Sequence, residues 1–112
     1  MPMGTRAQCI VCRGSKLLMA RHKLKGEEWW CLPGGRVEDG ETSAEAAIRE
    51  LKEECCVDGV IIRQTCHLAS ALDDAADTFL IDIGSQEPEL GTDPEFPGED
   101  QPLVGLKWLA LS

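Results

Sequence analysis

Three glutamates in the middle of the chain have the residue type and spacing that metal-dependent chemistry requires. On an α-helix, Glu50, Glu53 and Glu54 fall within an arc of roughly 100°. Carboxylates gathered on one face repel one another, and a bound divalent cation reverses that repulsion. Oxygen ligands of this kind suit Mg²⁺ or Mn²⁺. The alternative is a solvated acidic helix face, which three glutamates alone do not exclude.

The element that must position these glutamates is a helix beginning after Thr42. Thr42 and Glu45 have the spacing of a capping box. Apolar residues then recur at helical intervals, at Ala44, Ala47, Ile48, Leu51 and Cys55. This apolar stripe is centred roughly 120° from the glutamates. We therefore expect the stripe to pack on a sheet and the glutamates to lie beside the packing seam, in a cleft.

The glutamates also belong to a longer pattern of spaced residues. It consists of Gly35, five residues, Glu41, seven residues and the run Arg49-Glu50-Leu51-Lys52-Glu53-Glu54. This pattern resembles the Nudix box of MutT-like Nudix hydrolases, which would span residues 35–57. The preceding segment, Trp30-x-Leu32-Pro33-Gly34-Gly35, is similar to the strand and turn that enter the box. The resemblance covers most of the chain and weighs against a merely solvated acidic face.

The resemblance implies a role for each position of the box. Glu50, Glu53 and Glu54 would be the metal-binding carboxylates, with the backbone carbonyl of Gly34 as a further ligand and Mg²⁺ or Mn²⁺ as the cofactor. Arg49 would orient the glutamates through charge-assisted hydrogen bonds.

Two further box residues are expected to be structural. Glu41 would steady the N-terminus of the helix or accept hydrogen bonds from Arg49. Gly35, with Gly34, would allow a tight turn that side chains would block.

The activity implied by the resemblance is metal-dependent hydrolysis of a phosphoanhydride bond in a nucleoside diphosphate linked to another moiety. Water would attack one phosphorus, and the bridging oxygen would leave. The general base is either Glu50 or Glu99, a loop residue with Glu95 and Asp100 nearby in the sequence. The alternative function is a non-catalytic Nudix-fold module that binds a nucleotide or a protein, but the complete charged set of the box favours catalysis.

Substrate contacts are expected from residues outside the box. The candidates are Arg21, Lys23 and Trp30, whereas His22 is interpreted as a surface residue and Trp29 as core or pocket wall. The sequence leaves the substrate open among oxidised nucleotides, nucleoside triphosphates, nucleotide sugars, ADP-ribose and dinucleoside polyphosphates.

One box position departs from the family pattern, because Cys56 stands where a glycine is usual. That glycine normally serves a left-handed helix C-terminus. Either Cys56 adopts this conformation at a cost of about 1 to 2 kcal/mol, or the helix continues and ends near Gly59. The departure leaves the carboxylates unaffected.

The predicted architecture is an α/β or α+β fold within a single domain of residues 1–112. Strands are expected at residues 6–12, 16–20, 29–32, 57–69, 78–83 and 103–109, with a long loop at 84–102. The Nudix resemblance implies an α/β/α sandwich around a mixed sheet. The chain stops at Ser112, where many members begin a closing helix, so we expect a missing C-terminal helix or a homodimer that covers the exposed sheet.

Composition narrows the choice of partners. The formal net charge of -9 disfavours nucleic-acid polymers and anionic membranes, which leaves a small nucleotide as the expected partner. No export signal or membrane-spanning run of apolar residues is present, so a cytoplasmic location with reduced cysteines is expected. Cys9 and Cys12 face opposite sides of a predicted strand, which argues against a zinc site.

Overall fold

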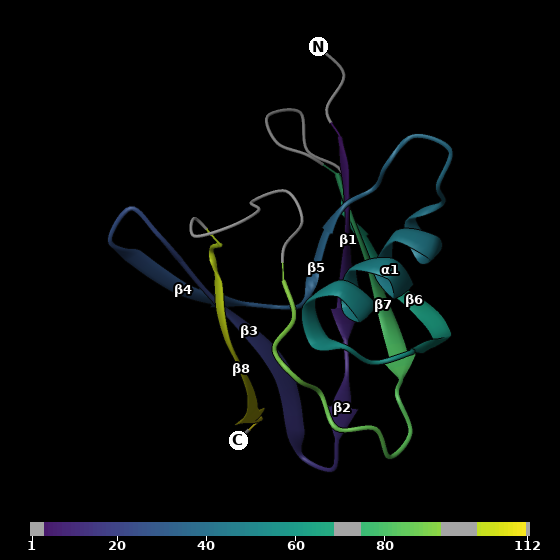
Figure 1. Cartoon of the computed structure of the whole chain (residues 1–112). Helices are drawn as coiled ribbons and strands as arrows, with labels where there is room; N and C mark the ends of the chain where they lie inside the picture. The colour runs from purple at the N-terminus through teal and green to yellow at the C-terminus, as the bar shows by residue number, and fades with distance from the viewer. Residues whose placement is uncertain (1–3, 69–74, 93–100, 112) are drawn as a thin grey trace.

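Two four-stranded sheets and one helix form the described part of the chain, which a computed structural model defines for residues 4–68, 75–92 and 101–111 (Figure 1). The elements in chain order are β1 Thr5–Ile10, β2 Cys12–Arg13, β3 Lys16–Leu24, β4 Glu27–Cys31, β5 Gly34–Arg36, α1 Ser43–Cys55, β6 Val60–Leu68, β7 Ala75–Asp82 and β8 Leu103–Ala110. The predicted α+β class is confirmed. Of the two helical layers of the expected α/β/α sandwich, the described residues contain one.

Sheet A has the strand order β5-β1-β7-β6 and is mixed, since β1 runs parallel to β7 and antiparallel to β5. Figure 1 shows α1 lying across one face of this sheet. The core fills that interface, and its buried members include Ala7 and Cys9 of β1 and Leu51 of α1. Sheet A therefore supplies the surface on which the apolar stripe of α1 packs.

Sheet B contains β2, β3, β4 and β8, with β3 pairing antiparallel to the other three strands. β2 and β3 form a hairpin whose turn is Gly14-Ser15. The expected single strand over residues 6–12 is wrong, because Val11 separates β1 in sheet A from β2 in sheet B. The buried side chain of Val11 thus marks the point where the chain crosses between sheets.

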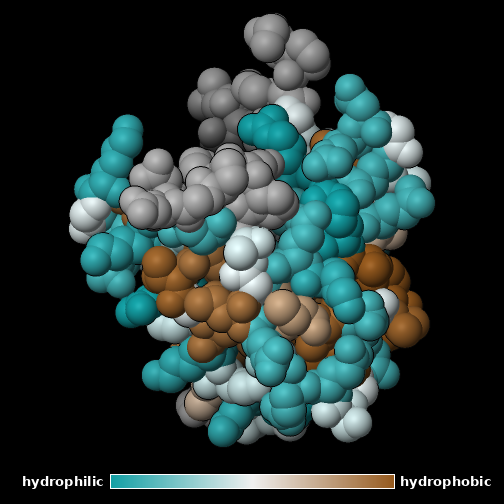
Figure 2. All heavy atoms as spheres, in the orientation of Figure 1, coloured by the Kyte–Doolittle hydropathy of each residue, from teal (hydrophilic) through white to brown (hydrophobic). Residues whose placement is uncertain are grey.

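Helix α1 begins with the predicted capping box. The Glu45 backbone N–H donates to Thr42 Oγ1 at 3.1 Å, and the Thr42 N–H donates to Glu45 Oε1 at 2.9 Å. Behind this cap, Ala46, Ala47 and Leu51 are buried against the sheet. The surface around α1 is mostly hydrophilic, with apolar residues showing at its sides (Figure 2). No helix in residues 4–68, 75–92 or 101–111 has the length and apolarity to span a membrane.

The helix ends in the left-handed conformation at Cys56, with φ 59° and ψ 33°, and the Cys56 N–H donates to Lys52 O at 3.0 Å. The alternative end near Gly59 is therefore wrong. Gly59 is instead required for packing, because a Cβ there would lie 2.4 Å from Cγ2 of Ile81. Cys56 takes the place of the usual glycine without moving the helix end.

Replacement of Cys56 by glycine is expected to stabilise the protein by about 1 kcal/mol, because glycine adopts the left-handed conformation without a Cβ clash. Urea unfolding of the wild type, Cys56→Gly and Cys56→Ala measures the change. The alanine variant keeps the Cβ and should show no gain. A glycine variant less stable than the alanine variant would contradict this assignment of strain.

Candidate functional site

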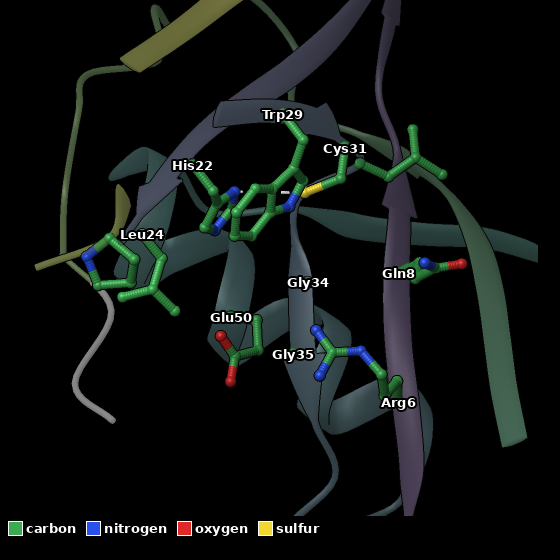
Figure 3. Close-up of a pocket in the computed structure, with 11 residues that line it drawn as sticks. Arg6, Gln8, His22, Leu24, Trp29, Cys31, Gly34, Gly35 and Glu50 are labelled. Carbon is green, nitrogen blue, oxygen red and sulfur yellow. Dashed lines mark hydrogen bonds between the residues drawn. The ribbon is translucent and has the colours of Figure 1, made fainter. Parts of the chain in front are cut away.

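A pocket of about 370 Å³ lies where the two sheets meet the N-terminal side of the box (Figure 3). Its walls include Arg6 of β1, His22 and Leu24 of β3, Trp29 and Cys31 of β4, and Glu50 of α1. Gly34 and Gly35 of β5 also line it. The pocket thus brings one face of sheet B opposite a carboxylate of the box helix.

Two box glutamates are held out of solvent beside this pocket. Glu50 is 4% exposed and Glu54 is 1% exposed. The Gly34 N–H donates to Glu54 Oε1 at 2.8 Å. A Cβ at Gly35 would lie 2.5 Å from Glu50 Cδ, and one at Gly34 would lie 2.1 Å from Ala7 O. Both glycines are therefore required by close contacts, since β1 approaches Gly34 and the Glu50 carboxylate approaches Gly35.

Arg49 connects the acidic residues of the box. Its Nε and Nη2 donate to both carboxylate oxygens of Glu41 at 2.8 and 3.0 Å. Its Nη1 donates to Glu50 at 2.9 Å and to Glu53 at 3.1 Å, and Nη2 also reaches Arg36 O at 3.0 Å. These bonds raise the pKa of Arg49, and the hydrogen bonds from Arg49 lower the pKa of Glu41. Four separate groups are thereby fixed by one guanidinium.

His22 joins the other buried carboxylate to the pocket wall. Its Nε2 lies 3.9 Å from Glu54 Oε2, and its Nδ1 lies 3.3 Å from the Cys31 sulfur. The imidazole also stacks on Trp29 at a centroid distance of 5.8 Å (Figure 3). Burial, followed by the charge of Glu54, raises the pKa of the Cys31 thiol, so Cys31 is a neutral wall residue near pH 7.

The sequence model of the NUDIX domain matches residues 3–111 of this chain. The chain belongs to the Nudix family. It is 48% identical over 46 residues to the putative 8-oxo-dGTP diphosphatase YtkD of Bacillus subtilis (strain 168), a match that covers 40% of this chain and 27% of YtkD. It is 37% identical over 46 residues to the uncharacterized Nudix hydrolase YvcI of the same strain, covering 41% of this chain and 28% of YvcI.

Solved structures show the same Nudix fold at lower identity. The NUDIX hydrolase from Nitrosomonas europaea superimposes with a TM-score of 0.76 at 20% identity, covering 98% of this chain and 74% of that one. An ADP-ribose pyrophosphatase from Streptococcus suis gives a TM-score of 0.73 at 17% identity, covering 97% and 75%. The matched segments span only about a quarter of the curated relatives, so those relatives inform the family and not the substrate.

The three residues expected to bind substrate do not line the pocket of this Nudix fold. Arg21 and Lys23 alternate along β3 with the pocket residue His22, and Trp30 lies across from Arg21 in the register of β3 and β4. Side chains of adjacent strand residues point to opposite faces. Arg21 instead forms an ion pair with Glu28 at 3.4 Å.

The residues of these strands that face the pocket are His22 and Trp29. The interpretation of His22 as a surface residue is wrong, since its side chain is only 13% exposed. The signal for His22 was present in the sequence. His22 shares the strand alternation of the buried residues Leu18 and Ala20. Trp29 is 43% exposed and is a pocket wall, not a core residue.

Glu99, the loop candidate for the general base, lies outside the described residues, as do Glu95 and Asp100. The choice between Glu50 and Glu99 therefore stays a prediction.

The donor set of the box fits a hard divalent cation in its chemistry. Glu50 and Glu54 are buried carboxylates, and buried charges require a compensating partner. In residues 4–68, 75–92 and 101–111, no three acidic, histidine or cysteine side chains already converge as a ligand group. Glu53 is turned towards Arg49 and is 28% exposed. The ligand role that the family resemblance implies for Glu53 would require Glu53 to turn away from Arg49.

Glu41→Gln is expected to reduce the free energy of unfolding by about 1 to 3 kcal/mol at pH 7, because a charged hydrogen-bond acceptor of Arg49 is lost. The pKa of Glu41 is lowered by folding, so its contribution is present above the unfolded pKa and is lost as the pH falls through the folded one. The deficit should therefore shrink below about pH 4.

Denaturant unfolding from pH 7 to pH 3 measures this deficit. Glu38→Gln is the matched control, because Glu38 is 69% exposed and its carboxylate lies 3.8 Å from Arg49. Equal deficits for the two variants would show that Glu41 is not a special partner of Arg49.

Proposed function

We propose that this Nudix chain hydrolyses a phosphoanhydride bond in a nucleoside diphosphate linked to another moiety, using Mg²⁺ or Mn²⁺. The observation that carries the proposal is the pair of carboxylates on α1, Glu50 and Glu54, held almost out of solvent beside a pocket. A solvated acidic helix face would leave such side chains exposed. Their burial supports a role that needs fixed, partly dehydrated oxygen donors.

Glu50, Glu53 and Glu54 would hold the metal, together with the Gly34 carbonyl. When bound, the metal lowers the pKa of water and offsets the charge of the diphosphate. Arg49 would orient Glu50 and release Glu53 for ligation. Of the two candidates for the general base, Glu50 lines the pocket and can accept a proton there, while Glu99 remains the alternative.

The pocket walls favour a nucleotide as the small-molecule partner. The Trp29 ring and the Leu24 side chain offer apolar surface for a base, and the Arg6 guanidinium points into the same space as the Glu50 carboxylate (Figure 3). In a chain with a net charge of -9, a cation placed in this pocket favours an anionic substrate. These residues are better placed for substrate contact than Arg21, Lys23 or Trp30, which do not line the pocket.

The names of two relatives supply the first substrates to test. YtkD is named for 8-oxo-dGTP, and the Streptococcus suis protein for ADP-ribose. Both compounds contain a phosphoanhydride bond in a nucleotide. They differ in what is linked to the diphosphate, so a panel that includes both separates the substrate classes left open by the sequence.

The cellular setting is also part of the proposal. All six cysteines are free, which supports a reducing compartment such as the cytoplasm.

The outer strand β6 exposes apolar side chains. More than half of the surface of Val60, Ile62 and Leu68 is exposed, and such an apolar surface supports a homodimer.

Glu54→Gln tests the proposed activity directly. The variant is expected to lose at least about 100-fold in metal-dependent turnover, because a metal ligand supports several kcal/mol of transition-state stabilisation. Turnover is measured with Mg²⁺ and Mn²⁺ on a panel of 8-oxo-dGTP, ADP-ribose, nucleoside triphosphates, nucleotide sugars and dinucleoside polyphosphates. Glu28→Gln is the control, since Glu28 is 47% exposed, pairs with Arg21 and does not line the pocket. Equal, metal-independent rates for wild type and both variants would refute the proposal.

A further inference from the structure

The chain after β7 lies along the C-terminal end of α1 and makes main-chain hydrogen bonds to it (Figure 1). The N–H groups of Glu89, Gly91 and Thr92 donate to the carbonyls of Cys55, Glu54 and Glu53 at 2.9, 2.8 and 2.9 Å, respectively. We call residues 86–92 the capping strap.

These bonds complete the end of the helix. The last four carbonyls of an α-helix lack partners within the helix. Here the Lys52 carbonyl accepts from the Cys56 N–H, and the capping strap supplies donors for the next three carbonyls. The last turn of α1, which carries Glu53 and Glu54, is therefore held against fraying by a segment that is distant in sequence.

A side-chain anchor holds the start of the capping strap. Gln86 Oε1 accepts from the Asp58 N–H at 2.9 Å, and Gln86 Nε2 donates to the Asp58 carbonyl at 2.7 Å. The strap is thus paired with the chain on both sides of Cys56, from Asp58 back to Glu53.

Gly91 is the position that allows this close contact. A Cβ at Gly91 would lie 1.9 Å from the Glu53 carbonyl oxygen and 3.1 Å from the Glu54 carbonyl carbon. Main-chain atoms cannot yield as a flexible side chain would. Any other residue at Gly91 therefore forces the capping strap away from the carbonyls of Glu53 and Glu54.

We propose that the capping strap positions the metal-binding carboxylates, with Gly91 as its essential positioning residue. Glu54 is bonded at its side chain to Gly34 and at its carbonyl to Gly91, so the strap and the Pro33-Gly34-Gly35 turn fix the same residue from two sides. This inference rests on the proposed function, since it takes Glu53 and Glu54 as ligands of a divalent cation.

Gly91→Ala is expected to weaken Mn²⁺ binding about 10- to 100-fold, as is usual when a residue that supports metal ligands is removed. Binding is measured by titration calorimetry or by the electron paramagnetic resonance of free Mn²⁺, without any nucleotide. With a substrate in hand, kcat should fall while KM changes little, because the pocket walls on β3 and β4 are untouched. Gln86→Met, which removes the Asp58 anchor, should weaken Mn²⁺ binding in the same direction.

Gly14→Ala is the matched control. Gly14 has φ +60° and no heavy atom near its added Cβ, so alanine there adds backbone strain remote from α1 and should leave Mn²⁺ affinity unchanged. If Gly91→Ala folds and binds Mn²⁺ like the wild type, the strap is merely structural. The inference then fails, and the proposed function is unaffected. If Gly91→Ala does not fold, Gln86→Met decides: weaker Mn²⁺ binding supports the inference, and unchanged Mn²⁺ binding refutes it. A wild type that binds no Mn²⁺ refutes the proposed function and the inference together.

Discussion

The arrangement of this Nudix chain depends on holding two carboxylates, Glu50 and Glu54, out of water. A buried carboxylate without partners is strongly destabilising, so each must be compensated where it lies. Arg49 donates to Glu50, and the Gly34 N–H donates to Glu54. Removal of one partner would leave a buried charge, which explains why the box combines acidic residues with an arginine and two glycines.

The same constraint accounts for how both ends of α1 are built. At the start, the capping box of Thr42 and Glu45 fixes the first turn. At the end, the left-handed Cys56 and the backbone of residues 89–92 satisfy the last carbonyls. Because the backbone groups at both ends have partners, the helix is held against fraying, which helps to keep its carboxylates beside the pocket.

The sequence predicted the parts of the molecule that local periodicity controls. The capping box, the apolar stripe and the acidic face of α1 follow from residues within one helix, and the structure contains all three. The expected strand ended at residue 20, whereas β3 extends to Leu24. Alternation continued past Ala20 separates His22 from Arg21, but it does not say which face meets the second sheet. The break at Val11 depends on how two sheets share one chain segment, which no local pattern encodes.

Other features depend on contacts between distant main-chain atoms. The bonds from Glu89, Gly91 and Thr92 to α1 join residues more than thirty positions apart and involve backbone groups that every residue carries, so Gly91 alone marks them in the sequence. Cys56 adopts the conformation of a glycine because the surrounding structure stabilises it. The single domain over residues 1–112 and the role of Glu99 stay predictions.

The most direct test of the account is anomalous diffraction from a crystal of this chain containing Mn²⁺. The account predicts an anomalous peak between α1 and the Gly34 turn, in contact with the carboxylates of both Glu50 and Glu54. A peak bound elsewhere, with neither the Glu50 nor the Glu54 carboxylate in contact with the ion, would contradict it.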